Sequence, residues 1–267
     1  MLPTHPRVHV GVILMKFLPL LCLSLSLTTL SALALEDQPT LMTTRGKLLV
    51  NEDFSQPLKP FDGKSNGFAS GFSGWRWNAV PRGGKWAVED GVFTGRETLE
   101  VKHPATASYG VKFKDVVIQC QVRMNDVPLG GRKYRSLSVR TVDAKDYVCS
   151  IHMSEGGFRI TKDDNDHGGP DKSVPLGTRL MPLKLGEWHT VVFEILGTEM
   201  VGTVDGQSMT GTHPLIGTDK HSIMFVNGVE GSVRDFKVWE AQPNPEWPAQ
   251  KAKLIATQAA ATAKAAK

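Results

Sequence analysis

The chain has 267 residues, of which 31 are basic and 27 acidic, so its formal net charge is +4, and 40% of its residues are hydrophobic. These values are typical of a globular protein, and they exclude an intrinsically disordered or a collagen-like chain. Removing the first 34 residues leaves 29 basic and 27 acidic residues, and this net charge of +2 argues against a nucleic-acid partner.

The first 34 residues have the pattern of a signal peptide. A basic residue, Lys16, precedes an apolar run from Phe17 to Leu30, and the segment Ser-Ala-Leu-Ala ends at Ala34. This layout predicts cleavage near Ala34 and export to the periplasm or the exterior, with residues 35–45 as a lead-in. The alternative is that the apolar run is retained as a single membrane anchor. We expect no transmembrane span in the mature chain, because no later segment is apolar over a sufficient length.

Short β-type segments separated by glycine and Asp-Gly pairs fill residues 46–241. Their number and the lack of β-α-β alternation predict an all-β fold of antiparallel sheets, packed as a sandwich or a barrel. In the last segment, the alternation breaks between Val233 and Phe236, which predicts a β-bulge. The expected strands lie near residues 47–54, 85–89, 92–95, 109–113, 115–124, 134–142, 146–153, 157–162, 188–196, 199–204, 221–226 and 232–240.

A proline-rich hinge precedes an alanine- and lysine-rich tail over residues 242–267. Alanine favours helix, so the tail is predicted to form a short surface helix. Its apolar side chains are Leu254 and Ile255, which predicts weak docking onto the sheets.

Two cysteines, Cys120 and Cys149, remain after signal-peptide cleavage. In VVIQCQVRM and DYVCSIHM the alternation places both thiols on the inward faces of their strands. A disulfide and two separate buried thiols are both compatible with this pattern. Neither cysteine has the sequence spacing of a zinc site.

Four runs resemble successive strands of the concanavalin A-like lectin and glucanase (jelly-roll) superfamily: GKWAVEDGVFTG, YGVKFKDVVIQCQVRM, LGEWHTVVFEILGTEMVGTVDG and SVRDFKVWEA. Within it, residues 46–241 are most similar to the 3-keto-disaccharide hydrolase domain family of exported bacterial proteins. The resemblance implies an antiparallel two-sheet jelly-roll sandwich that binds or cleaves sugars, some members acting on glycosides oxidised at carbon 3. The matching motifs belong mainly to the scaffold, so they indicate the fold more than an activity.

The middle strands depart from the family pattern. The family's Asn-Ser-Gly-Ile and Tyr-Glu-x-Gln strands correspond here to YRSLSVRT and DYVCSIHM, which lack the acidic and amide side chains. Arg135, Arg140 and His152 are the larger polar residues that remain. Alternation places Arg140, Ser150 and His152, with Ser138, on the outer face of their sheet. A cluster of hydroxyls, an arginine and an imidazole is suited to a sugar, although an ordinary solvated sheet face has the same pattern.

The segment KDDNDHGGPDKS concentrates carboxylates beside two glycines. Asp163, Asp164, Asp166 and Asp171 supply the oxygen ligands that calcium prefers, so a calcium site is one expectation. The alternative is an acidic turn whose aspartates cap backbone amides. Without a metal, Asp164 or Asp166 can pair with His167 in acid–base chemistry.

Tryptophans gather in GFSGWRWNAVPRGGKW. Trp75 and Trp77 are candidates for stacking on sugar rings, because an exposed tryptophan offers a large flat surface. Core packing is the competing interpretation.

The sequence lacks the Walker A, G-x-G-x-x-G and H-E-x-x-H motifs of other enzyme classes. Three functions remain. The first is carbohydrate recognition around Arg140, Ser150 and His152. The second is cleavage of 3-keto-glycosides, in which His152 or His167 removes the proton that the ketone acidifies and Arg140 or a cation stabilises the enolate. The third is a non-catalytic envelope module that makes contact through residues 242–267.

Overall fold

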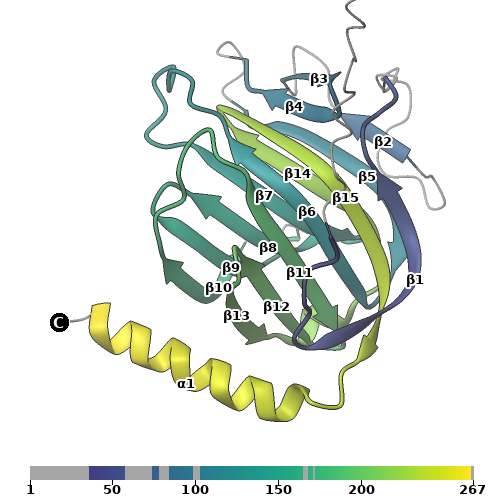
Figure 1. Ribbon diagram of the computed structural model, residues 1–267, viewed down its shortest axis with the longest axis vertical. Coiled ribbons are helices and arrows are strands. Elements are labelled where there is room, and N and C mark those ends of the chain that lie inside the picture. The colour runs from purple at the N-terminus through teal and green to yellow at the C-terminus, as the bar shows by residue number, and fades with distance from the viewer. Residues whose placement is uncertain are drawn as a thin grey trace, which may run out of the picture. The chain divides into compact units, whose positions relative to one another are not determined.

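The computed structural model describes residues 36–57, 74–77, 84–98, 103–164, 168–170 and 172–265. They belong to one compact unit, Ala34–Lys267. Two antiparallel sheets face each other, and a single helix follows the last strand (Figure 1). The expected all-β, antiparallel two-sheet sandwich with a helical tail is therefore confirmed, whereas the signal peptide lies outside the described residues.

Sheet A has the strand order β13-β12-β11-β6-β15-β4-β3, with β1 also paired to β15, and sheet B has the order β10-β9-β8-β7-β14-β5-β2. The elements are β1 (Thr43–Glu52), β2 (Gly74–Trp77), β3 (Lys85–Glu89), β4 (Val92–Arg96), β5 (Ala105–Phe113), β6 (Val116–Met124), β7 (Ser136–Asp143), β8 (Tyr147–Ser154), β9 (Gly157–Asp164), β10 (Lys172–Leu180), β11 (His189–Leu196), β12 (Glu199–Val204), β13 (Gln207–Thr212), a 3-10 turn (Pro214–Gly217), β14 (Lys220–Gly228), β15 (Glu230–Pro243) and α1 (Trp247–Ala265).

The core lies between the two sheets, and the period of two in each strand decides which side chains enter it. In β8, Cys149, Ile151 and Met153 are at most 1% exposed and pack in this core. From sheet A, Ile118 and Cys120 of β6 enter the same cluster. The expected inward direction of both thiols is confirmed, and of the two alternatives the structure has separate free cysteines. Burial raises the pKa of both thiols, which makes them poor nucleophiles.

Tight turns and one bulge occur where the sequence predicts them. Asp90 and Asp205 have φ values of 49° and 47°, and the glycines that follow them also have positive φ, as a type I′ hairpin requires. In β15 the register shifts between Arg234 and Lys237, which confirms the bulge expected in this strand. Three strands were not expected from the sequence: β2, β10 and β13.

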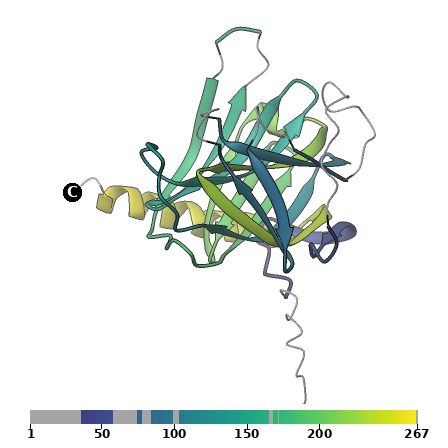
Figure 2. The ribbon, with the colours of Figure 1, turned by 90° about the horizontal axis from the view of Figure 1, so that it is seen from above.

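Helix α1 runs along the outside of the sandwich beside β13 (Figures 1 and 2). Its main anchor is Trp247, which packs with Met42 and Val201, and whose Nε1 donates a hydrogen bond to Glu199 at 3.2 Å. Leu254 packs against the same cluster, while Ile255 is 48% exposed. No helix among the described residues is long and apolar enough to cross a membrane.

Glu194 fastens the N-terminal segment to sheet A. β1 begins at Thr43, so the last residues of the expected lead-in belong to the sheet. The buried Glu194 carboxylate accepts hydrogen bonds from the backbone amides of Leu41, Met42 and Thr43 at 2.8–3.0 Å, and from the Thr43 hydroxyl at 2.8 Å. Burial raises the pKa of Glu194, and these four donors act in the opposite direction.

We predict that Glu194→Gln lowers the free energy of unfolding by about 1–3 kcal/mol, because an amide NH₂ would face backbone donors in a buried place. Urea unfolding at neutral pH measures the change. The control Glu89→Gln removes an exposed carboxylate from β3 and is expected to change stability by less than about 0.5 kcal/mol. Equal effects of the two substitutions would contradict the anchoring role of Glu194.

A second prediction concerns pH. The pKa of His189 is raised, chiefly by its hydrogen bond to Asp205 at 2.6 Å, so the folded protein holds a proton that the unfolded chain releases near its ordinary value of about 6.5. This contribution is complete below about pH 6.5 and is lost as the pH rises through the folded-state pKa. His189→Gln is therefore expected to cost more stability at about pH 5.5 than at about pH 8.5. The same loss at both pH values, with the exposed His103→Gln as control, would exclude a protonated His189.

Candidate functional site

The outer face of sheet B carries a polar surface on the neighbouring strands β7, β8 and β9. The residues between its members, such as Val139 and Ile151, are fully buried in the core. Side chains at paired positions of adjacent strands have Cβ atoms about 5 Å apart, so they can contact each other or the same ligand. Two cross-strand rows result, Ser138–His152–Arg159 and Arg140–Ser150–Thr161. The outer-face position expected for Ser138, Arg140, Ser150 and His152 is confirmed.

Asp163 of β9 lies in the next row of this face and is held by hydroxyl groups. Its carboxylate accepts hydrogen bonds from Ser173 at 2.5 Å, Thr161 at 3.1 Å and Ser150 at 3.4 Å. Three neutral donors satisfy the carboxylate without a cation in direct contact. Asp163 therefore serves as a fixed negative charge beside the two rows.

Arg140 lies at the centre of the surface, and its guanidinium is largely buried. Its Nε atom has no hydrogen-bond partner among the described residues. Burial lowers the pKa of Arg140, Asp163 raises it and the neighbouring Arg159 lowers it. A guanidinium at this place has donor groups available for a ligand.

His152 is uncharged at neutral pH. Burial, followed by the positive charges of Arg159 and Arg140, lowers its pKa to about 4, and Asp163 offsets only part of this effect. Its Nδ1 atom lies 2.8 Å from the Ser138 hydroxyl, which fixes the orientation of the ring. A neutral imidazole offers one donor and one acceptor, which suits a hydroxyl-bearing ligand.

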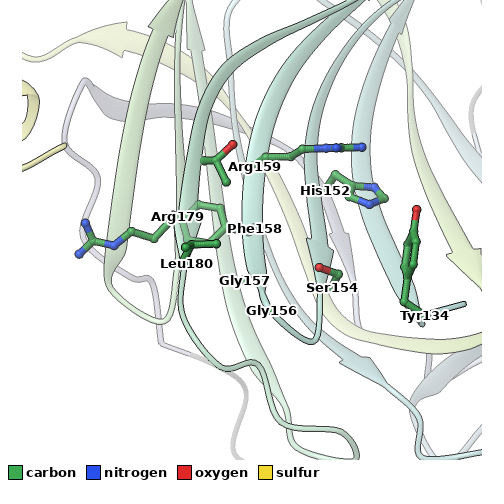
Figure 3. A pocket seen from close by; sticks show the side chains of 10 residues that line it. Tyr134, His152, Ser154, Gly156, Gly157, Phe158, Arg159, Arg179 and Leu180 are labelled. Atoms are coloured by element: carbon green, nitrogen blue, oxygen red, sulfur yellow. The ribbon is translucent and has the colours of Figure 1, made fainter. Parts of the chain in front are cut away.

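A pocket of about 350 Å³ opens on this face along β8, β9 and β10. In Figure 3 the side chains of Arg159, His152 and Tyr134 project to the same side, while Arg179 points the other way. Tyr134 is 55% exposed, which leaves its ring available for stacking. Besides Tyr134, His152 and Arg159, the pocket is lined by Ser154, Thr178 and Leu180 among others.

Two of these residues, Tyr134 and Arg159, were missed at the level of sequence. Arg159 follows the alternation of β9 and could have been found by extending the parity argument by one strand. Tyr134 precedes β7, and no periodic pattern assigns it to either face.

Arg135, expected to bind substrate, has a structural role instead. Its guanidinium donates to the Val127 carbonyl and forms ion pairs with Asp126 at 3.3 Å and Glu155 at 3.2 Å. Its side chain is only 12% exposed. Since these contacts hold the segment before β7, Arg135 is unavailable to a ligand, and the expectation is corrected.

The tryptophans expected to stack on sugar also pack inward. Trp77 is 7% exposed, and the half-buried Trp75 lies in an aromatic cluster with ring centroids 4.8 Å from Phe93 and 5.2 Å from Tyr109. β2 pairs with β5 so that Trp75 lies opposite Tyr109 on the core side. Core packing is thus the correct interpretation of both tryptophans.

The expected calcium ligands are separated where they can be seen. Asp163 and Asp164 are successive residues of β9, so their side chains leave opposite faces of the strand. Asp166, His167 and Asp171 lie outside the described residues. Within the described part of the chain, no group of three or more histidine, cysteine or acidic residues can hold a metal ion. The calcium site stays a prediction.

No family model matches the sequence, and no curated protein is found to be similar to it. Solved structures do match. The carbohydrate-binding module CBM66 of Bacillus subtilis is 12% identical with a TM-score of 0.51, over 65% of this chain and 100% of that module. LamAcat of Zobellia galactanivorans is 10% identical with a TM-score of 0.50, over 72% of this chain and 97% of that one.

A third solved structure is the GlcNAcα1-4Gal-releasing endo-β-galactosidase of Clostridium perfringens. It is 11% identical with a TM-score of 0.50, over 78% of this chain and 65% of that enzyme, so this chain matches under two thirds of its length. The chain has a concanavalin A-like jelly-roll fold. At these identities the similarity establishes the fold and leaves the function to the site.

The environment of His152 leads to a prediction that can be tested without any ligand. Its imidazole is expected to titrate near pH 4 in the folded protein, and NMR of the ring carbons or nitrogens follows this directly. Because the unfolded chain binds this proton at higher pH, the depressed pKa also removes stability as the pH falls below about 6.5.

Arg159→Gln should raise the pKa of His152, whereas Lys47→Gln, which removes an exposed charge from β1 of sheet A, should leave it unchanged. A titration of His152 at the ordinary value of about 6.5 in the native protein would show that the surface is hydrated and lacks the inferred positive potential.

Proposed function

We propose that this chain is an exported carbohydrate-recognising domain that binds its sugar on the outer face of sheet B. The observation that carries the proposal is the central Arg140. Its Nε atom is buried and has no hydrogen-bond partner among the described residues, and hydroxyl and imidazole groups lie on the neighbouring positions of the sheet. Sugar hydroxyls both donate and accept, so they pair with such a mixed surface. Export rests on the signal-peptide pattern of residues 1–34.

Aromatic and polar groups occur together at the pocket, as a sugar site needs. The exposed Tyr134 can cover an apolar face of a sugar ring, while His152 and Arg159 reach its hydroxyls from the floor. The fold supports the same conclusion, because one structural neighbour is named a carbohydrate-binding module and another an endo-β-galactosidase.

Recognition is favoured over glycoside hydrolysis by the scarcity of acids. Glycosidases of the usual kind place two carboxylates about 5–10 Å apart on either side of the bond that breaks. On the described part of this face, the two rows and the row beside them contain one acid, Asp163, and three hydroxyls already hold it. A single engaged carboxylate does not supply both the acid and the base.

A second candidate function is cleavage of 3-keto-glycosides, the activity of some members of the 3-keto-disaccharide hydrolase domain family that the sequence resembles. One observation favours it: His152 is uncharged and lines a pocket beside Arg159. In such a reaction a base removes the proton at carbon 2, the adjacent ketone takes up the charge as an enolate, and the glycosidic C1–O bond then breaks. An imidazole with a pKa of about 4 is a weak base, so this activity ranks second.

The proposal predicts that residues 36–267 bind glycans on an array and that Arg140→Gln weakens this binding by about tenfold or more, which corresponds to about 1.4 kcal/mol. Ser208→Ala is the matched control, since Ser208 bonds to Thr203 on sheet A. Absence of binding by a folded sample, or the same loss in both variants, would refute the proposal.

The enzymatic alternative is tested by incubating the protein with 3-keto-glucosides and their unoxidised parents, with and without a chelator. Ketone-dependent release of sugar that disappears in His152→Ala and His167→Ala would establish the enzyme and displace simple recognition. Turnover unchanged in both variants would exclude the histidines as the base.

A further inference from the structure

Arg140 and Arg159 differ from every other arginine that the structure describes. Neither has a hydrogen bond, an ion pair or an aromatic ring as partner within the described part of the chain. The remaining described arginines all have one, in most cases an acid, an amide, a carbonyl or a tryptophan ring; these are Arg45, Arg76, Arg96, Arg123, Arg132, Arg135, Arg179 and Arg234. Two arginines without partners therefore coincide on one face of one sheet.

The arrangement of the strands brings the two arginines to the same surface. Arg140 and Arg159 lie on β7 and β9, on either side of β8, and they are offset by one cross-strand row. At ordinary strand spacing their Cα atoms are roughly 12 Å apart, a distance that two arginine side chains span from opposite sides. Figure 3 shows the Arg159 side chain extending toward His152 of β8, the strand that lies between those of the two arginines.

This space has a positive potential that Asp163 offsets only in part. After burial, the charges of Arg159 and Arg140 lower the pKa of His152, and Asp163 opposes them. Asp163, the carboxylate nearest to the rows, is already bonded by Ser150, Thr161 and Ser173 and forms no ion pair with either arginine. A largely buried guanidinium without an ion-pair partner is unfavourable, and an anionic ligand would reduce that cost.

We propose that the sugar bound on this face is acidic, and that Arg140 and Arg159 bind its carboxylate or sulfate group above β8. The inference rests on the carbohydrate-binding function proposed above and specifies its ligand class. Guanidinium pairs with planar carboxylates and with sulfate-like oxyanions through paired, charge-assisted hydrogen bonds, which are stronger than bonds to neutral hydroxyls. The hydroxyls of Ser138, Ser150 and Thr161 are already bonded to His152 or Asp163, so the two guanidiniums are the charged donors left for the ligand.

The test compares matched charged and neutral polymers by affinity electrophoresis and calorimetry at physiological ionic strength. The probes are polygalacturonate and its methyl ester, and dextran sulfate and dextran. We expect at least one charged polymer to bind at least about tenfold more tightly than its neutral partner. A preference for polygalacturonate over its methyl ester would indicate a carboxylate ligand, and a preference for dextran sulfate over dextran would indicate a sulfate ligand.

Arg140→Gln and Arg159→Gln should each remove most of this preference, while Lys47→Gln on sheet A should preserve it. Arg159 is exposed, so its replacement is expected to leave the fold intact, and circular dichroism checks both variants. Equal loss in Lys47→Gln would indicate general attraction of polyanions and would overturn the inference.

The outcomes separate the two proposals. Equal binding of charged and neutral polymers would overturn the acidic ligand and leave carbohydrate recognition standing. Binding of a glycan on the array without any preference for acidic sugars has the same consequence. A folded protein that binds neither these polymers nor any arrayed glycan would refute both proposals together.

Discussion

The strict alternation of side chains along β7, β8 and β9 is the constraint on which both the core and the site depend. Each of these strands gives one face to the core and the other to the polar surface, so Val139 and Arg140, or Ile151 and His152, are neighbours in sequence with opposite environments. A shift of register by a single residue would bury the guanidinium and expose the aliphatic side chains. The packing of the core side chains therefore also fixes which residues lie on the polar surface.

The same alternation explains how much of the molecule the sequence reveals. The inward thiols of Cys120 and Cys149 and the outward positions of Arg140 and His152 follow from the period of two alone. β10 was missed because it is an edge strand with Pro175 and a register shift before Gly177, and its first half is exposed. Alternation requires one buried face, and the first four residues of β10 are exposed on both faces.

Side chains whose position depends on distant segments could not be assigned from local patterns. Trp75 faces the core because β2 pairs with β5, and nothing near Trp75 in the sequence encodes that pairing. Arg135 is occupied because Asp126 and Glu155 approach it from two different connections. Tyr134, next to Arg135, is 55% exposed. The sequence suggested tryptophans and arginines as groups that bind a ligand. Tertiary contacts determine which of these side chains are available to a ligand and which are occupied.

Some residues of the polar surface lower the stability of the folded protein. A largely buried arginine without an ion-pair partner and an imidazole kept neutral by burial and by two arginines both act against folding. Such conflicts between local environment and residue type are expected at functional sites, where binding requires groups that the fold alone does not satisfy. The Glu194 carboxylate is a contrast, because it is fully buried and four donors from the N-terminal segment satisfy it.

The most direct test of the central claim is to map the binding surface by NMR, adding oligogalacturonate to isotope-labelled residues 36–267 and following backbone amide and arginine side-chain shifts. We expect the changes to concentrate on β7, β8 and β9 and to include the Arg140 and Arg159 guanidiniums and the His152 ring. Shifts confined to the outer face of sheet A or to α1 would contradict it, because the ligand would then bind where the arginines already have partners.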